Sequence, residues 1–426
     1  MNILLIGQGG REHAIAWKIN QSPLLTKLFI APGNAGTSAT GENVQIDVNN
    51  FDQIKKFVIE KNISMVIVGP EEQLVKGIHD YFLVDNELKN IPVIGPTSQG
   101  AQLEGSKDFA KNFMQKYSIP TARFKTFDKS NYTEAASFLN SLTPPYVLKA
   151  DGLAAGKGVL ICNSFDQALA ELKEMILHEK FGAASRKVVI EEFLKGIELS
   201  VFVLTDCQSY KILPSAKDYK RIGVGDTGLN TGGMGSISPV PFADEVFMNK
   251  VEKRIIIPTI NGLQTEQISY KGFIFFGLIN VGGDPFVIEY NVRLGDPESE
   301  SVIPRIKSDL LDLLKGIADN NLAEKKLEID QRFCASVFLV AGGYPSDYEK
   351  GKIINGIEAV ENSLVFHAGT KWTEDHLNVI TNGGRVLTVT SFGNSLDEAL
   401  KQAYNDVKII NFQGMYYRKD LGFDLK

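Results

Sequence analysis

The first hundred residues alternate short apolar runs with amphipathic stretches. The apolar runs have the length of strands and are rich in Ile, Val and Met, and they fall at residues 3–6, 27–31, 65–68 and 92–94. The stretches between them repeat apolar positions three to four residues apart, as helices do. Strands that alternate with helices predict a parallel α/β sheet. We expect this N-terminal domain to cover residues 1–102.

The first of these strands runs into a glycine turn that precedes a helix. Backbone N–H groups at a helix N-terminus attract anions. The turn does not match a dinucleotide fingerprint, because Glu12 stands at the third glycine position. It is therefore either a structural turn or a site for a monophosphate or sugar phosphate. A second loop, residues 32–37, follows the second strand at the carboxyl edge of the sheet, where ligands bind. The substrate-binding candidates here are Gly7, Gly9, Gly10, Arg11 and Asn34.

A second domain is expected from residue 103 to residue 324. Within it, residues 146–149 and 159–162 read as two strands joined by a glycine-rich turn. The turn lacks the spacing, the Ser or Thr and the following helix of a Walker A loop. It is typical of a hairpin that folds over a triphosphate, although a plain hairpin with solvated lysines has the same composition. The candidates for nucleotide binding are Lys149, Gly156, Lys157 and Gly158.

Two further segments of this domain point to ligands. Residues 188–194 and 196–201 read as strands joined by an acidic hinge, which suits an adenine slot and a carboxylate for ribose hydroxyls; the candidates are Glu191, Glu192, Phe193 and Glu198. Residues 214–241 are too rich in glycine for regular structure, and mixed polar side chains favour a substrate loop over a linker. Its candidates are Asp218, Lys220, Asn230, Thr231, Gly232 and Gly233.

Residues 286–301 carry the strongest chemical signal in the chain. In a strand, Glu289, Asn291 and Arg293 share one face, while Ile288, Tyr290 and Val292 face the core. Carboxylate and amide oxygens are ligands that Mg²⁺ accepts beside substrate phosphates, and a guanidinium holds phosphate or carboxylate. The alternative is a half-exposed edge strand with solvated charges. Gly295 opens a turn directly after this row and is a further substrate candidate.

The last hundred residues, 325–426, predict a small β-rich domain. Short strands are expected at 335–340, 364–368 and 385–389, with one helix at 396–409. The predicted fold class is therefore mixed, α/β and α+β, with a parallel N-terminal domain, a two-lobed central domain and this β-rich domain.

Composition narrows the class of partner. The net charge is −6, so no basic surface favours nucleic acid. No apolar run approaches the length of a membrane span, and the N-terminus shows no signal-peptide pattern. The three cysteines, Cys162, Cys207 and Cys334, show neither a zinc spacing nor a disulfide framework. We expect no nucleic acid or membrane partner, a cytoplasmic location and a monomer.

Several motifs, in this order, resemble the phosphoribosylamine-glycine ligase (glycinamide ribonucleotide synthetase) family of ATP-grasp enzymes. They begin with IGQGGREHA and APGNAGT, continue with KADGLAAGKGV and NTGGMG, and end with RLGDPESE. The resemblance implies a pre-ATP-grasp domain, an ATP-grasp domain and a C-terminal domain. It also implies a carboxylate-amine ligase of purine biosynthesis, without the extra domains of multifunctional enzymes, that joins glycine to 5-phosphoribosylamine with ATP and Mg²⁺ or Mn²⁺.

The resemblance also implies roles for individual residues. Glu289 and Asn291 would bind the metal, and Lys107 and Lys149 would contact phosphates. Glu191 and Glu198 would serve adenine and ribose, and Arg293 would stabilise the transferred phosphoryl group. The expected catalytic residues are Arg293, Lys149 and Asp218.

The chain departs from the family pattern at four positions. Tyr219 replaces a usual histidine, Val224 an acid and Leu229 a proline, and Asp424 stands where arginine is common. These departures bear on the rigidity of the substrate loop and on one phosphate contact. Two other functions stay open, an ATP-grasp carboxylase acting on a different acid and a non-catalytic nucleotide-binding module. The complete set of motifs and the absence of a biotin-type lysine disfavour the carboxylase, and the intact row at 289–293 disfavours the binding module.

Overall fold

The computed structural model describes residues 1–154 and 158–425. The N-terminal part is a parallel sheet with strand order β3-β2-β1-β4-β5. Its strands are β1 (Asn2–Gly7), β2 (Lys27–Pro32), β3 (Glu42–Asn43), β4 (Met65–Val68) and β5 (Val93–Ile94). The helices connected to them are α1 (Gly10–Ile19), α2 (Phe51–Glu60), α3 (Glu71–Val75), α4 (Ile78–Val84) and α5 (Ser98–Gly105).

Both faces of this sheet are covered. Leu4 and Ile6 of β1 belong to one hydrophobic cluster, whereas Ile3 and Leu5 belong to another. Successive side chains of a strand point to opposite faces, so a strand that is apolar throughout lies between two cores. The predicted parallel α/β domain is confirmed.

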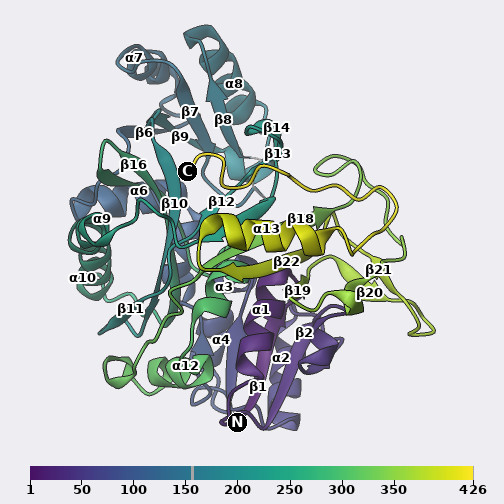
Figure 1. Ribbon diagram of the computed structural model, residues 1–426. Helices are drawn as coiled ribbons and strands as arrows, with labels where there is room; N and C mark the ends of the chain where they lie inside the picture. Colours follow the sequence, from purple (N-terminus) through teal and green to yellow (C-terminus); the bar gives the residue numbers. More distant parts are fainter. Residues whose placement is uncertain (155–157, 426) are drawn as a thin grey trace.

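The central part contains two antiparallel sheets of four strands. The smaller lobe has the order β6-β9-β7-β8 and its own hydrophobic cluster. Its elements are β6 (Phe124–Asp128), α7 (Ala135–Asn140), β7 (Tyr146–Ala150), β8 (Val159–Cys162), α8 (Phe165–Leu177) and β9 (Lys187–Glu192). In Figure 1 this lobe lies at the top, away from the N-terminal sheet.

The second central sheet has the order β11-β10-β16-β17. Its strands are β10 (Ile197–Thr205), β11 (Tyr210–Ile212), β16 (Gly272–Val281) and β17 (Asp284–Asn291). The helices of this part are α6 (Lys107–Lys116), α9 (Glu245–Val251), α10 (Ile257–Thr265), α11 (Ser299–Val302) and α12 (Leu310–Ala318). A π-helical turn (Glu252–Ile256) separates α9 from α10.

The C-terminal sheet has the order β12-β15-β18-β22-β19, with one helix packed on it. Its elements are β12 (Lys217–Asp218), β15 (Gly235–Ser238), β18 (Phe333–Val340), β19 (Leu364–His367), β22 (Arg385–Gly393) and α13 (Leu396–Val407). Two strands therefore come from the middle of the chain. The proposed boundary at 324/325 stays a prediction, but it cuts across this sheet.

Two small hairpins complete the fold. One pairs β13 (Arg221–Gly223) with β14 (Thr227–Asn230), and the other pairs β20 (Thr370–Trp372) with β21 (Val379–Thr381). The prediction that residues 214–241 lack regular structure is wrong. Some of their glycines lie inside the short strands β13 to β15, and others lie in the turns between them; Gly225, in the turn between β13 and β14, adopts a positive φ angle.

Candidate functional site

Two cavities lie where these parts meet. The small cavity encloses about 270 Å³ between α5, α6, β7 and β17. The large cavity encloses about 1110 Å³ between the N-terminal sheet and the C-terminal part. The small cavity collects most of the predicted nucleotide and metal residues, namely Lys107, Lys149, Gly158, Glu191, Glu289, Asn291 and Arg293, with Gly232 at its edge. The predicted residues Gly156 and Lys157 lie outside the described residues.

The acidic row at the end of β17 lines the small cavity. Glu289 and Asn291 face it, while Tyr290 on the opposite face is 2% exposed. Ile288 was predicted to face the core and does not. A register shift opposite Gly277 and Leu278 puts Val287 in the core and leaves Ile288 lining the cavity. A β-bulge inserts one residue into the pairing and so interrupts the alternation of faces.

The surroundings of Asn291 assign the direction of its amide. With its nitrogen turned inward it donates to Tyr290 O (3.0 Å) and Glu104 Oε1 (3.1 Å). The amide oxygen then points away from these two acceptors, and with the Glu289 carboxylate it would offer two oxygen ligands to a metal ion. No group of three or more His, Cys, Asp or Glu side chains fit to hold a metal occurs in 1–154 or 158–425. Two oxygen ligands completed by substrate phosphates are a typical site for Mg²⁺, so this pair fits the expected ion.

Arg293 lies just beyond β17 and is held from three sides. Its Nη2 donates to Glu104 Oε1 (2.8 Å), its Nε to Glu71 Oε2 (3.2 Å) and its Nη1 to Leu294 O (3.2 Å). Burial raises the pKa of Glu104 to about 7, against the opposing effect of the Arg293 charge. Glu104 was missed from the sequence, because nothing in the amphipathic pattern of α5 separates it from an ordinary helical glutamate.

A buried charge network supports the lysines. Lys149 Nζ lies 2.9 Å from Glu191 Oε1 and donates to Ile288 O (3.1 Å). Lys111 Nζ lies 2.8 Å from Glu191 Oε2, and both lysines are less than 6% exposed. Burial would raise the pKa of Glu191, but Lys149 and Lys111 hold it below its usual value. Glu191 therefore anchors two lysines; its predicted contact with adenine or ribose stays a prediction.

Lys107 begins α6 and also faces the small cavity. Its Nζ donates to Gly152 O (3.4 Å), and burial lowers its pKa. A cation without a close carboxylate at such a position suits a phosphate oxygen.

The other predicted adenine and ribose residues lie off the small cavity. Glu192 Oε1 accepts from Arg123 N (2.8 Å), and Phe193 is 40% exposed. Glu198 pairs with Lys220 (3.0 Å) in a narrow cleft beside Glu289.

Asp218 lies in the same cleft as Glu289. Burial raises its pKa, and the neighbouring Glu198 and Glu289 carboxylates add to the effect. The cleft brings together the predicted pair Asp218 and Lys220 with one ligand of the metal row. A small ligand with one amine and one carboxylate would complement the charges of Asp218 and Lys220.

The N-terminal glycine turn only partly reaches the large cavity. Gly9 lines it, but the Gly9 N–H already donates to Glu12 Oε2 (2.6 Å). Gly10 faces Glu300, and a Cβ there would overlap the Glu300 carboxyl oxygen. Burial near Asp296 raises the pKa of Glu300 well above its usual value. Carboxyl groups thus surround this turn, and its role as a phosphate site stays a prediction.

Two other candidates of this region are used by the fold. Arg11 pairs with Glu12 (2.5 Å) and donates to Leu294 O (3.2 Å). Asn34 lines the large cavity, but its amide nitrogen donates to Gln8 O and His367 O at 2.8 Å each. Gly7 and Gly295 pack against the side chains of Glu12 and Glu298 and line neither cavity.

Gly232 joins the two cavities. It lines the small cavity, and its N–H donates to the Tyr344 hydroxyl (2.9 Å) while its carbonyl accepts from Arg385 Nη1. Arg385 also pairs with Asp296 (3.0 Å), and Tyr344, Arg385 and Asp296 all line the large cavity. Gly233 packs on Pro297, and Thr231 Oγ1 accepts from its N–H (2.9 Å). Of the loop candidates, Asn230 is exposed on β14.

Comparisons with known proteins identify the family of the chain. Three models of phosphoribosylglycinamide synthetase match consecutive parts of the chain: the N domain at 1–104, the ATP-grasp (A) domain at 105–299 and the C domain at 334–424. The phosphoribosylamine–glycine ligases of Fusobacterium nucleatum and Escherichia coli K12 are 43% and 44% identical over 99% of this chain and 98% of theirs. A bifunctional purine biosynthetic protein of Schizosaccharomyces pombe is 45% identical over 98% of this chain, which spans about half (53%) of that protein.

Solved structures give the same result. The phosphoribosylamine–glycine ligase of Thermotoga maritima aligns with a TM-score of 0.85 and 35% identity, over 99% of this chain and all of that one. The biotin carboxylase domain of a Hydrogenobacter thermophilus 2-oxoglutarate carboxylase, solved with MgADP, shares the fold alone, with a TM-score of 0.71 and 16% identity over 97% of this chain and 91% of that one. The described residues contain no helix long and apolar enough to cross a membrane. With three domain models in order and full-length relatives above 40% identity, the chain belongs to the phosphoribosylglycinamide synthetase family, an ATP-grasp family of ligases.

Proposed function

We propose that the protein is an ATP-dependent ligase that joins glycine to 5-phosphoribosylamine and releases glycinamide ribonucleotide, ADP and phosphate. We assign Mg²⁺ as its metal, with Mn²⁺ as the alternative, and a monomer in the cytoplasm as its working state. The observation that carries the proposal is the junction at Gly232. Gly232 lines a cavity suited to a triphosphate and a metal, and it is hydrogen-bonded to Tyr344 and Arg385 of a second, larger cavity that suits the amine substrate.

The first step activates glycine in the small cavity. A carboxylate is a poor electrophile, so one of its oxygens attacks the γ-phosphorus of ATP in line, ADP leaves, and glycyl phosphate forms. Lys107 and Lys149 bind the triphosphate, and Arg293, fixed by Glu71 and Glu104, faces the transferring group. Glu289 and Asn291 would hold Mg²⁺, whose charge offsets the negative charge that develops on the phosphoryl oxygens.

We place glycine beside Glu289, which lines both the small cavity and the cleft of Asp218 and Lys220. Its ammonium group suits Asp218, and its carboxylate suits Lys220. The cleft itself encloses only about 10 Å³, so it must widen to admit the amino acid.

The second step transfers the glycyl group to the amine held in the large cavity. The amine nitrogen attacks the acyl carbon, the C–O bond to phosphate breaks, and the nitrogen loses a proton to give the amide. The Asp296 carboxylate at the Gly232 junction suits the hydroxyl or amine groups of the sugar. The 5-phosphate then faces the opposite rim, where Lys371 has no ion-pair partner among residues 1–154 and 158–425.

Glycine labelled with ¹⁸O in both carboxyl oxygens tests this route. One labelled oxygen should appear in the released phosphate and one should stay in the amide. ADP release should also require glycine, and phosphate release should require both glycine and phosphoribosylamine. Label confined to the amide product would refute the acyl phosphate, and turnover without glycine would refute the assigned substrate.

A further inference from the structure

The end of the chain lies against the β13–β14 hairpin. We call residues 416–424 the tail segment. Arg418 in this segment contacts Asp226, which precedes it by 192 residues. In Figure 1 the yellow tail runs from the C-terminal part toward β12 and the hairpin. Neither the metal row nor the lysine network involves these residues.

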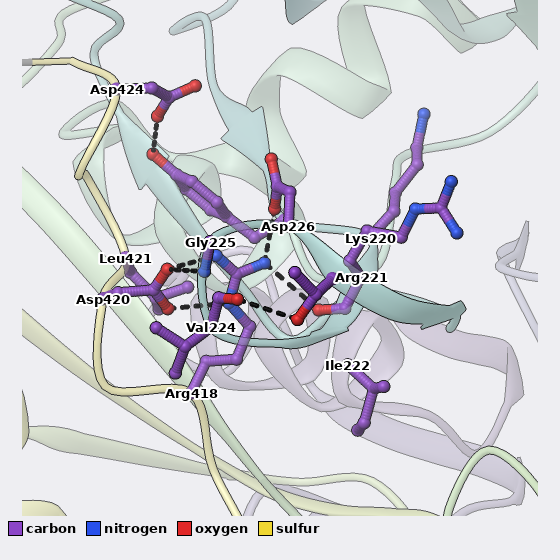
Figure 2. A network of polar contacts seen from close by, with 12 residues as sticks. Lys220, Arg221, Ile222, Val224, Gly225, Asp226, Arg418, Asp420, Leu421 and Asp424 are labelled. Atoms are coloured by element: carbon purple, nitrogen blue, oxygen red, sulfur yellow. Dashed lines mark hydrogen bonds and ion pairs between the residues drawn. The ribbon is translucent and has the colours of Figure 1, made fainter.

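Arg418 is the centre of the contact. Its side chain is fully buried, its Nε and Nη2 donate to Asp420 (2.9 and 2.8 Å), and its Nη1 donates to Asp226 Oδ1 and to Arg221 O (3.1 Å). Figure 2 shows the guanidinium between the hairpin tip and the tail. A planar fork of five donors makes this set of bonds, and an ammonium group does not.

Further bonds join the tail segment to both ends of the hairpin. At the tip, Asp420 Oδ2 accepts from Gly225 N (2.7 Å). Along β13, the Tyr416 hydroxyl donates to Ile222 O (2.9 Å). Side chains of the tail segment therefore tie it to the hairpin.

Two departures from the family pattern meet beside the hairpin. The Tyr219 hydroxyl donates to Asp424 Oδ1 (2.9 Å), and Lys217 pairs with the same carboxylate (3.2 Å). Burial beside Asp424 raises the pKa of Tyr219 well above its usual value. Asp424 lies away from the residues that line either cavity, so its replacement of arginine bears on the tail contact.

The hairpin has little other support. It forms a sheet of only two strands, and all four residues of β14 are exposed. Ile222 is its contact with the hydrophobic cluster around Phe338. Isolated two-stranded hairpins are at best marginally stable in water, so the tail contacts decide how well this one is ordered.

The base of the hairpin is connected to Gly232, which lines the small cavity. Thr231 follows β14 directly, and both its N–H and its hydroxyl donate to Lys220 O (2.7 and 2.8 Å), which closes the base of the hairpin. Gly232 is the next residue. A shift of the hairpin therefore moves Gly232 and Lys220 together.

We propose that the tail segment is a clamp on the β13–β14 hairpin and that Arg418 is a positioning residue for Lys220 and Gly232. The kinetic part of this inference rests on the proposed function, whereas the clamp itself does not. Arg418 touches no substrate; it acts through the hairpin.

Hydrogen exchange of the full chain without substrates tests the clamp. Asp226→Asn removes one charged hydrogen bond from the partly exposed tip, so exchange across residues 221–230 should rise about tenfold. Arg418→Lys should give a larger rise in the same peptides, and Arg418→Met the largest. Arg332→Met is the matched control. Like Arg418, Arg332 pairs with an aspartate two residues away and stacks on an aromatic ring, here Phe392, but it lies away from the hairpin. If Asp226→Asn and Arg418→Lys leave exchange in the hairpin unchanged, the clamp is refuted.

Kinetics separates positioning from a general loss of structure. In Asp226→Asn, kcat/KM for glycine and for the amine should fall about tenfold, while ATP binding measured by calorimetry should change less than about twofold, since Lys107 and Lys149 lie on other elements. Equal losses for all three substrates would overturn the positioning role. Failure of the proposed reaction would leave the exchange result intact, so the two inferences are tested separately.

Discussion

Lys111 offers the sharpest test of the lysine network. It lies on α6, 2% exposed, with Nζ bonded to Glu191 Oε2 (2.8 Å) and Thr121 Oγ1 (2.7 Å). Burial lowers its pKa from 10.5 to about 8, against the attraction of Glu191. Lys111→Met removes the cation but keeps most of the apolar stem. Among residues 1–154 and 158–425, Glu191 is then left with Lys149 as its cationic partner.

The expected loss of stability follows from the burial of Glu191. Breaking a buried ion pair from one side costs about 3–5 kcal/mol, and the remaining Lys149 reduces this to about 2–3 kcal/mol near neutral pH. Glu191 should also draw Lys149 toward itself and away from the phosphates, which raises KM for ATP about tenfold. Lys116→Met on the same helix is the control. Both Lys116 and its partner Glu266 are at the surface, so the loss of stability should be much smaller than that of Lys111→Met.

The lowered pKa of Lys111 makes the free energy of unfolding depend on pH. Because the folded pKa of Lys111 is lower than the unfolded value, the unfolded chain binds more protons between pH 8 and 10.5, and stability rises with pH in this window. The fall from 10.5 to about 8 corresponds to about 3 kcal/mol. Urea unfolding from pH 7 to 10.5 should therefore show the wild type gaining stability relative to Lys111→Met. If the difference in free energy of unfolding between the wild type and Lys111→Met does not change with pH, and KM for ATP is unchanged, the proposed coupling of Lys111, Glu191 and Lys149 is refuted.

Two further predictions concern the opposite wall of the small cavity. Glu289→Gln should lower ADP release at least about a hundredfold at saturating Mg²⁺ without lowering the melting temperature, because a metal ligand is lost and no fold contact is; full turnover would contradict the metal assignment. Glu104 should make the free energy of unfolding fall as the pH rises, whereas Lys111 makes it rise, and Glu104→Gln should remove this fall. Burial raises the folded pKa of Glu104 to about 7, so the wild type should lose up to about 3 kcal/mol relative to the variant between pH 4.5 and 7, and a flat difference in urea unfolding would exclude this.

The limits of sequence reasoning follow from what a periodic pattern contains. Strand β4 has the predicted bounds, because an apolar run between turn residues defines a buried strand. The alternation in β17 placed Glu289 and Asn291 on the cavity face. The same alternation wrongly placed Ile288 in the core. A β-bulge depends on the pairing with the neighbouring strand, so the sequence of β17 alone does not predict it.

Contacts that the sequence pattern does not contain account for what was missed. Glu191 reads as an acid at a strand end, and only the fold shows Lys111 and Lys149 on either side of it. The glycine turn at Gly9 reads as an anion site, yet its N–H is taken by a carboxylate three residues later. A pattern identifies the chemistry that a segment offers, whereas the tertiary structure decides which partner uses it.

The mixed origin of the C-terminal sheet has a consequence for dividing the protein. Strand β18 pairs with β15 on one side and with β22 on the other, and seven of its eight residues are buried. A fragment that starts at 325 keeps β18, β19 and β22 but lacks β12 and β15. It would present β18 as a long apolar edge, open to pairing with another copy of itself. Fragments cut at this point should therefore aggregate when expressed alone, and the two pieces should become soluble only when they are produced together.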